Sequence, residues 1–482
     1  MTLAKGTVHG DICGMTLRIA NAAGFFGDNL DAPRLTVERA EVDYLTLEYL
    51  AELTMSILAR IREKNPQAGY AADFLTVLES LTPALSAQPQ LKIVTNAGGM
   101  NPHACAAAAA KILCDAGLGE TQIGIVDGDD LLPRLEELQS AGCAFEHLDS
   151  GQPLASLQHP AVSANAYLGA KPIAQALSDG ARIVITGRVA DASLVVGPAM
   201  HRFGWDWDDW NRLASASVAG HLIECGAQVT GGFYTNWNGG KLEQDFTSGL
   251  RLDLGNIGYP VAEIESDGAC VITKPEGTGG IVNRQTVCEQ LVYEIGDPAH
   301  YLTPDVDVDF TNVQVEELGP NRVRVIGALG NPAPDSYKVS LAYRDGFTGS
   351  GTMLCYGRDC VAKARACAGI IRQRLAASGC EFFDEDFYVE LLGSGDGVPG
   401  LHSAPAELRE VMLRVSVRNA DRAAVERFLR EFAPLATSGP AGLAGYAAGR
   451  SSARPVFSYW PTTVRKEYLT PGVQVVAAAS MT

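Results

Sequence analysis

The chain has 482 residues, of which 46% are hydrophobic and 20% are charged, and its formal net charge is -18. This composition is typical of a globular protein with a large core, and the length predicts two domains of roughly 200 residues each. Because an acidic chain lacks the basic surface that nucleic acids and anionic membranes attract, we expect neither as a main partner.

The sequence also lacks the marks of secretion and membrane insertion. Its N-terminal segment has no basic start followed by a long apolar run, and no window holds about 18 uninterrupted apolar residues. The 11 cysteines are scattered without a Cys-x-x-Cys pair, which favours free thiols in a reducing compartment. We therefore expect a cytoplasmic protein.

The first half alternates short strands with helices. Runs that predict strands occur in LRIAN, at 42–47, 91–95 and 122–126, and in ARIVITG, and a helix is predicted at 104–115. This alternation predicts an α/β fold with a parallel, Rossmann-like sheet and helices on both faces. In such sheets the chemistry gathers at the carboxyl ends of the strands, which groups loops 23–31, 96–103, 127–130 and 187–193.

The second half does not continue this regular alternation of strands and helices, and its pattern predicts a second α/β or α+β lobe. Strands are expected at 306–315, 322–328 and 411–418, helices at 359–376 and 420–432, and two strands around a Gly-rich turn within 337–357. An extended, Pro-interrupted tail follows. We place the domain boundary near 235–250, which gives domains 1–240 and 241–482.

The first strand-end loop, AAGFFGDNLDA, resembles a phosphate-cradling turn because Gly24 and Gly27 leave the backbone accessible. It matches neither G-x-G-x-x-G nor a Walker loop, so a dinucleotide site is not supported. The alternative is a tight turn in which Asp28 or Asp31 caps a helix. Asp28 is also a candidate carboxylate reagent.

The second loop, TNAGGMNPHACA, carries small and polar residues between a strand and a helix. Asn96, Gly98, Gly99 and Asn101 are candidate donors to a developing oxyanion. His103 lies in the first turn of the helix, where a lowered pKa suits a base or a hydrogen-bond donor. The alternative for His103 is a surface residue in a capping turn.

The third loop, TGRVADAS, pairs a cation with an acid. Arg188 suits bidentate capture of a carboxylate or phosphate, and Asp191 is its nearest partner. The alternative is a structural salt bridge across the loop.

The segment GHLIECGAQVTGG places three reactive side chains on one helix face, since His221, Glu224 and Cys225 are three and four residues apart. General acid/base use of His221 and Glu224 is the favoured interpretation. Cys225 with His221 is a candidate nucleophile and base. We predict no metal site, because a catalytic zinc usually takes three protein ligands.

The segment VITKPEGTGG sets Lys274 before a Gly/Thr loop with Thr278 and Gly279, an arrangement suited to an anion such as a CoA phosphate or a carboxylate. The alternative is a surface β-turn with a solvated lysine.

Several motifs occur together in a fixed order: AGFFGDNLDA, TNAGGMNPHA, ANAYLGAKPIAQAL, ITGRVADASL, HLIECGAQVTGG, IGYPVAEI and ITKPEGTGGIV, followed by GDPAHYLTPDV and SYWPTTVRKE. The set resembles the acyclic terpene utilisation protein AtuA family over nearly the whole chain. The resemblance implies a place in acyclic terpenoid breakdown, where substrates travel as acyl-CoA thioesters. Some members carry a further small ferredoxin-like domain, which implies a separate small subunit as a partner here.

These observations predict a cytoplasmic enzyme that acts on a carboxylate or an acyl-CoA by a lyase or hydratase step. Arg188, Lys274 and the loop around Gly279 would bind the anion, and His221 with Glu224 would act as acid and base, with Asp28 as competitor. The alternatives are thioester or amide hydrolysis by Cys225 and a non-catalytic acyl-CoA-binding or scaffold subunit. We expect no cofactor beyond CoA in the substrate, and a homo-oligomer.

Overall fold

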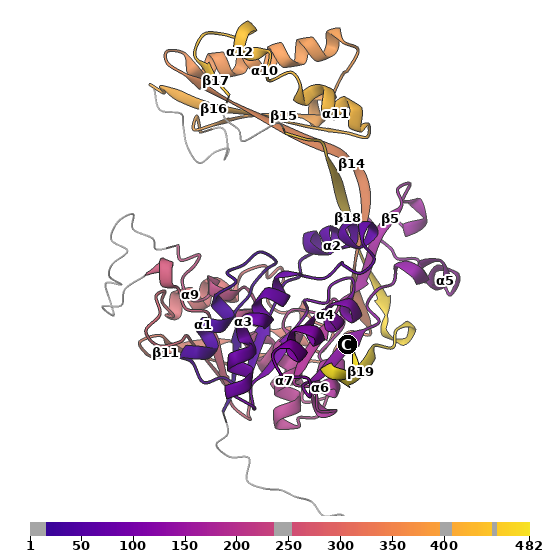
Figure 1. Cartoon of the computed structure of the whole chain (residues 1–482), viewed down its shortest axis with the longest axis vertical. Helices are drawn as coiled ribbons and strands as arrows, with labels where there is room; N and C mark the ends of the chain where they lie inside the picture. The colour runs from indigo at the N-terminus through magenta and orange to yellow at the C-terminus, as the bar shows by residue number, and fades with distance from the viewer. Residues whose placement is uncertain (1–15, 236–252, 396–406, 446–450) are drawn as a thin grey trace, which may run out of the picture. The chain divides into compact units, whose positions relative to one another are not determined.

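The computed structural model describes residues 16–235, 253–395, 407–445 and 451–482 (Figure 1). The chain divides into two compact units. The large unit takes Met1–Leu157, Val162–Ala342 and Trp460–Thr482, and the small unit takes Gln158–Ala161 and Tyr343–Tyr459. Each unit is described by itself below.

A ten-stranded sheet forms the centre of the large unit, in the order β11-β12-β8-β7-β1-β2-β3-β6-β4-β19. Its strands are β1 Leu17–Asn21, β2 Tyr44–Leu47, β3 Lys92–Thr95, β4 Gln122–Asp127, β6 Ile183–Thr186, β7 Val261–Ile264, β8 Cys270–Thr273, β11 Gln314–Gly319, β12 Arg322–Ile326 and β19 Gly472–Ala477. The five strands β1, β2, β3, β6 and β4 run parallel to one another. The predicted α/β fold with a parallel sheet is therefore confirmed.

Helices alternate with these strands along the chain. They are α1 Ala32–Arg39, α2 Glu52–Lys64, α3 Asp73–Ala87, α4 Pro102–Asp115, α5 Leu135–Ser140, α6 Lys171–Ser178, α7 Ser193–Phe203, α8 Trp210–Glu224 and α9 Arg284–Leu291. The helix predicted at 104–115 corresponds to α4, which buries Cys105, Ala106, Ala109, Ala110 and Leu113 at helical spacing. Its alanines let the helix lie close to the sheet, because they add little side-chain bulk.

The predicted domain boundary near 235–250 falls on residues 236–252, which lie outside the described residues. On its far side the chain returns to the same sheet: β7 pairs with β1, β8 with β7, and β12 with β8, all antiparallel. In the described residues the large unit thus takes sequence from both predicted domains, 1–240 and 241–482. β8 consequently runs parallel to β1, so the residues after β8 also lie at the carboxyl edge of the parallel strands.

The small unit is an antiparallel sheet with helices, as the predicted α+β lobe requires. Its strand order is β15-β16-β14-β17, with β14 Ser336–Tyr356, β15 Phe387–Leu392, β16 Glu410–Asn419 and β17 Leu443–Ala444. Its helices are α10 Cys360–Ala377, α11 Arg422–Leu429 and α12 Leu435–Ser438.

The remaining strands of the chain are β5 Ala161–Ala166, β9 Tyr301–Leu302, β10 Asp307–Asp309, β13 Leu329–Asn331 and β18 Arg454–Arg465.

Two strand predictions in the second half are wrong. The segment 337–357 is one long strand, β14, rather than two strands around a turn, and 306–315 contains two separate strands, β10 and the start of β11. The glycines of β14 serve close packing instead of a turn: a Cβ on Gly351 would clash with the Phe432 ring, and one on Gly349 would lie 2.8 Å from Val425.

Within the large unit, α8 lies very close to the start of α7. A Cβ on Gly220 would come within 2.8 Å of the Cα of Ala192 and 2.9 Å of its carbonyl oxygen. Because both atoms belong to the backbone, neither can move aside cheaply. Gly220 therefore sets how closely the end of α8 approaches the loop that follows β6.

We predict that Gly220→Ala lowers the unfolding free energy by about 1–3 kcal/mol, because the methyl group forces α8 away from Ala192. Denaturant unfolding followed by circular dichroism measures the change. Gly369→Ala is the matched control, since a Cβ there meets nothing within 4 Å in helix α10, and it should be neutral or stabilising by up to about 1 kcal/mol. Equal effects of the two substitutions would contradict the packing argument.

Candidate functional site

The end of helix α8 is held against the carboxyl edge of the sheet. The Asn21 amide, at the end of β1, donates hydrogen bonds to the carbonyl oxygens of Ile223 and Glu224, both at 2.8 Å. A Cβ on Gly24, in the loop after β1, would lie 2.7 Å from the carbonyl carbon of Cys225. Residues 221–225 therefore join the strand-end loops, although they lie some 200 residues from β1 in sequence.

Arg188 occupies the centre of this edge and is buried, with 2% of its surface exposed. Its Nη1 donates to the Leu50 carbonyl at 2.8 Å and to Asp191 Oδ1 at 2.7 Å. Its guanidinium lies over the Tyr167 ring, 4.1 Å from the centroid. The predicted partner of Arg188 is thus Asp191, and the structural salt bridge named as the alternative to an anion clamp is present.

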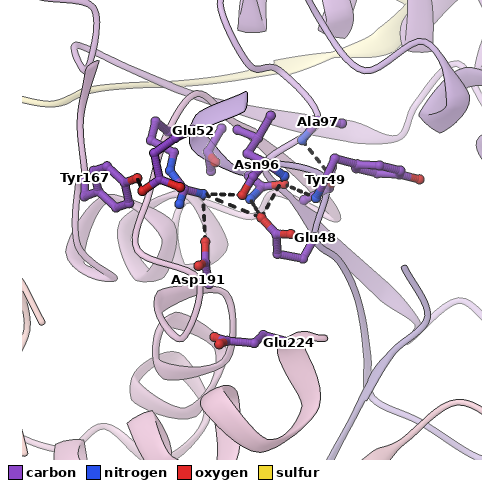
Figure 2. A network of polar contacts seen from close by, with 12 residues as sticks. Glu48, Tyr49, Glu52, Asn96, Ala97, Tyr167, Asp191 and Glu224 are labelled. Atoms are coloured by element: carbon purple, nitrogen blue, oxygen red, sulfur yellow. Dashed lines mark hydrogen bonds and ion pairs between the residues drawn. The ribbon is translucent and has the colours of Figure 1, made fainter. Parts of the chain in front are cut away.

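Glu48, directly after β2, is a second carboxyl group beside Arg188. Its Oε1 accepts hydrogen bonds from the Leu50 amide at 2.8 Å and the Asn96 amide at 2.5 Å, and it lies 3.6 Å from Arg188 Nη1. Figure 2 shows Glu48, Asn96 and Tyr49 in this network, in which Asn96 Oδ1 also accepts from the Tyr49 amide at 2.8 Å. Asn96, predicted as an oxyanion donor, holds Glu48 instead.

A third carboxyl group, Glu52, contacts Tyr167, the residue whose ring lies under the Arg188 guanidinium. Its Oε1 accepts from the Tyr167 hydroxyl at 2.5 Å and from Lys338 at 3.1 Å. Burial raises the pKa of Glu52, but these donors outweigh burial and bring the pKa to about 2. Glu52 is therefore ionised at neutral pH.

The sequence analysis missed Glu48, Glu52 and Tyr167. Glu48 carried a usable signal, since it follows the apolar strand run YLTL directly and the strand-end rule applies to it. Unlike the loops grouped from the sequence, the loop after β2 has no glycine to mark it. Glu52 and Tyr167 come together only through the tertiary fold.

His221 and Glu224 form a buried pair at the end of α8. His221 Nδ1 lies 3.2 Å from Glu224 Oε1, and His221 Nε2 lies 3.0 Å from the Gln290 carbonyl oxygen. Burial lowers the pKa of His221, but the bond to Glu224 and its charge outweigh it, so the net shift is upward. Burial raises the pKa of Glu224 to about 6. Because both ring nitrogens face acceptors, the imidazolium form is favoured.

One oxygen of Glu224 remains without a partner. Oε2 is buried and accepts no hydrogen bond from the described residues, while Oε1 is held by His221. The charge of Asp191 acts on Glu224 and also on Glu48 (Figure 2). Asp191 is the more open group, with 32% of its side chain exposed against 11% for Glu224 and 7% for Glu48. The cluster therefore reaches solvent through Asp191.

The remaining predicted acid and nucleophile, Asp28 and Cys225, lie at the same edge. Asp28 accepts from the Gly24 amide at 2.8 Å and from the Tyr259 hydroxyl at 2.5 Å, so its carboxylate closes the first loop. Asp31, the residue before α1, makes no side-chain capping bond. Burial raises the pKa of the Cys225 thiol far above its ordinary value, which keeps it protonated at neutral pH.

The second loop is organised around helix α4. Asn101 caps α4 by accepting from the Ala104 amide at 3.3 Å, and its own amide donates to the carbonyls of Pro66 and Ala68, both at 3.0 Å. Gly98 and Gly99 shape the turn, since a Cβ on Gly98 would lie 2.5 Å from the Thr186 oxygen and Gly99 has φ +50. His103 is exposed and pairs with Asp127 at 2.6 Å.

Lys274, Thr278 and Gly279 lie after β8, two strands from β1. The Lys274 ammonium donates to the Thr278 carbonyl at 2.7 Å and lies 3.2 Å from its hydroxyl. The Gly279 amide donates to Asn256 at 2.7 Å. Burial lowers the pKa of Lys274. In the described structure the hydrogen bonds from these donors therefore go to nearby protein oxygens, those of Thr278 and Asn256.

Among the described residues, no group of three or more His, Cys, Asp or Glu side chains is placed to hold a metal ion. None of the helices in the described ranges has the length and apolarity needed to cross a membrane.

The family model described as "Acyclic terpene utilisation family protein AtuA" matches residues 17–475, nearly the whole chain. The chain belongs to this family. Membership implies a role in acyclic terpene utilisation and confirms the resemblance inferred from the loop motifs. Among curated proteins and among solved structures, no match was found. The family assignment therefore rests on the match to the AtuA family model.

We predict that stability falls as the pH rises through the titration of the His221–Glu224 pair. Both pKa values are raised on folding, so the folded chain keeps protons that the unfolded chain releases. The change for Glu224, from 4.5 to about 6, corresponds to about 2 kcal/mol that is present below its unfolded pKa and lost above the folded value.

Unfolding free energies measured between about pH 4 and pH 7 test this expectation. Glu224→Gln should flatten the pH dependence, because glutamine does not titrate. Glu41→Gln is the control, since the Glu41 side chain is 96% exposed, and its curve should follow that of the unmodified chain. An unchanged slope in Glu224→Gln would contradict the assigned protonation.

Proposed function

We propose that this AtuA-family chain is an enzyme of carboxylic acid or acyl-CoA breakdown, and that Glu224 is the acid/base group of a lyase or hydratase step. The observation that carries the proposal is the state of the Glu224 carboxyl group. One oxygen is held by His221, and the other is buried with no hydrogen-bond partner among the described residues. A buried acceptor without a partner is costly, so it is retained where a ligand supplies the missing bond.

The pKa of Glu224 suits such a role. A general base works best when its pKa lies near the operating pH, and burial raises the pKa of Glu224 to about 6. In a hydratase step the carboxylate accepts the proton α to the substrate carbonyl, and the electron pair moves onto the carbonyl oxygen. Glu224 then returns this proton to the hydroxide that leaves the β-carbon, so water departs and the carboxylate is restored; the reverse sequence adds water.

His221 acts through Glu224 rather than on the substrate. Its side chain is 1% exposed, and both ring nitrogens are engaged by protein acceptors. It therefore orients Oε1 and holds the positive charge that stabilises the Glu224 carboxylate. His221 is a positioning residue, and the acid/base assignment made from sequence narrows to Glu224.

The two alternatives are weaker but remain open to measurement. A thioesterase built on Cys225 needs a thiolate, and burial opposes its formation. A non-catalytic acyl-CoA-binding subunit would bind thioesters without exchanging their protons.

We predict that the purified chain exchanges the α-protons of acyl-CoA thioesters with deuterium in D₂O, as followed by NMR. Glu224→Gln should slow exchange by about 10²–10⁴-fold, because the base is lost. His221→Gln should slow it less and move the pH profile, and Cys225→Ala should leave it unchanged.

Glu41→Gln is the surface control for these variants. If Glu224→Gln exchanges protons at the original rate, the acid/base assignment of Glu224 is wrong. Loss of turnover in Cys225→Ala would favour a thioesterase with Cys225 as its nucleophile. If no thioester of a broad panel exchanges, the binding-subunit alternative replaces the enzyme.

A further inference from the structure

The small unit contains a cavity of the size that small-molecule sites have. Its volume is about 710 Å³, within the roughly 300–1,000 Å³ that is usual for ligand pockets. It lies between strand β14 and the segment that runs from helix α11 into α12, and all its described lining residues belong to the small unit. The cavity is therefore formed by a single compact unit.

One wall of this cavity is apolar. Met353 of β14 lines it together with Leu429, Phe432 and Ala433. Gly351 lets the Phe432 ring lie against the strand, because a Cβ at this position would clash with the ring. A hydrocarbon chain bound along this wall would leave water, so its binding should strengthen with each added CH₂ group.

A positive charge without an ion pair lies at the same cavity. Helix α11 and its C-cap carry three arginines. Arg422 donates to Glu426 at 2.8 Å, and Arg427 pairs with Glu431. Arg430, the third, lines the cavity and forms no ion pair with any residue that the structure describes. Glu426 also lines the cavity, but Arg422 offsets its charge.

We propose that this cavity binds an apolar acyl chain that ends in a free carboxylate, with the carboxylate at Arg430 and the chain along the apolar wall. Arginine binds carboxylates through paired N–H donors. Ser451 and Ser452 also line the cavity, and their hydroxyl groups are further donors. The inference concerns the small unit alone, so it does not depend on the role of Glu224.

The charges of the lining favour a carboxylate over a phosphate group. A carboxylate has a single negative charge, which matches Arg430, the one cationic residue of the described lining. A phosphate monoester or a pyrophosphate would bring more negative charge close to Glu426. Fatty-acid-type ligands therefore fit the cavity better than nucleotide thioesters.

Met353 reports binding directly. In the full chain labelled with ¹³C at the methionine methyl groups, decanoate should shift the Met353 signal in a saturable way, and Met353→Leu identifies that signal. Met55 is the internal control, since it is buried in the core of the large unit. From hexanoate to decanoate the affinity should rise about fourfold per CH₂ group. An unmoved Met353 signal would overturn the inference.

Arg430→Gln tests the charge. It should weaken decanoate binding about fivefold, because an exposed ion pair is lost, and leave binding of the uncharged decanol unchanged. Arg358→Gln is the matched control, since Arg358 is an exposed arginine of the same unit outside the lining. Equal affinities of the two variants for decanoate would rule out the carboxylate site, and so would tighter binding of decanoyl-CoA than of decanoate.

Ala433→Phe tests the location. Ala433 is exposed and lines the cavity, so a phenylalanine there should block decanoate and decanol without disturbing the fold, as circular dichroism can verify. Ala423→Phe is the matched control, because Ala423 is an exposed alanine of α11 outside the lining. If both variants bind decanoate as the unmodified chain does, the ligand binds elsewhere and the inference is wrong.

Discussion

One buried guanidinium organises the carboxyl edge of the sheet. Removing a charge from water costs several kcal/mol unless partners replace the solvent, so Arg188 requires a set of acceptors at fixed positions. Its side chain binds Leu50 and Asp191, its backbone amide binds Asp129 at 2.9 Å, and its guanidinium covers Tyr167. Leu50, Asp191 and Asp129 come from the loops after β2, β6 and β4, and Tyr167 directly follows β5, so a single residue ties four strand ends together.

A second constraint holds the end of helix α8 at this edge. The Asn21 amide binds two carbonyls at the end of α8, and Gly24 leaves room for the backbone of Cys225. Both residues belong to the first βα connection, whereas α8 follows the last parallel strand. The contact sets Glu224 beside Asp191, which is itself held by Arg188. Glu224, the proposed acid/base group, therefore lies beside the Arg188–Asp191 pair because the first and last connections of the parallel sheet meet.

Sequence periodicity and turn chemistry predicted the parallel strands and grouped four loops at this edge, since strand alternation is local information. They did not include the segment after β2, which carries Glu48 and Glu52. Local information also placed Arg188 beside Asp191, three residues apart. It did not show that Asn96 holds Glu48, because that bond joins residues 48 apart. It misread the glycines of β14 as a turn, since only the tertiary fold reveals that Gly351 makes room for Phe432.

Four neighbouring carboxyl groups have different pKa values because their surroundings differ. Donors from Tyr167 and Lys338 hold the pKa of Glu52 near 2, whereas burial raises that of Glu224 to about 6, that of Asp129 to about 7, and that of Glu48 well above its usual range. At neutral pH Glu52 is therefore ionised, whereas burial favours the protonated form of Glu48. Such separation marks acid and base roles more reliably than residue identity does. It arises here because burial raises the pKa of Glu48, Asp129 and Glu224, whereas at Glu52 the donors Tyr167 and Lys338 outweigh burial.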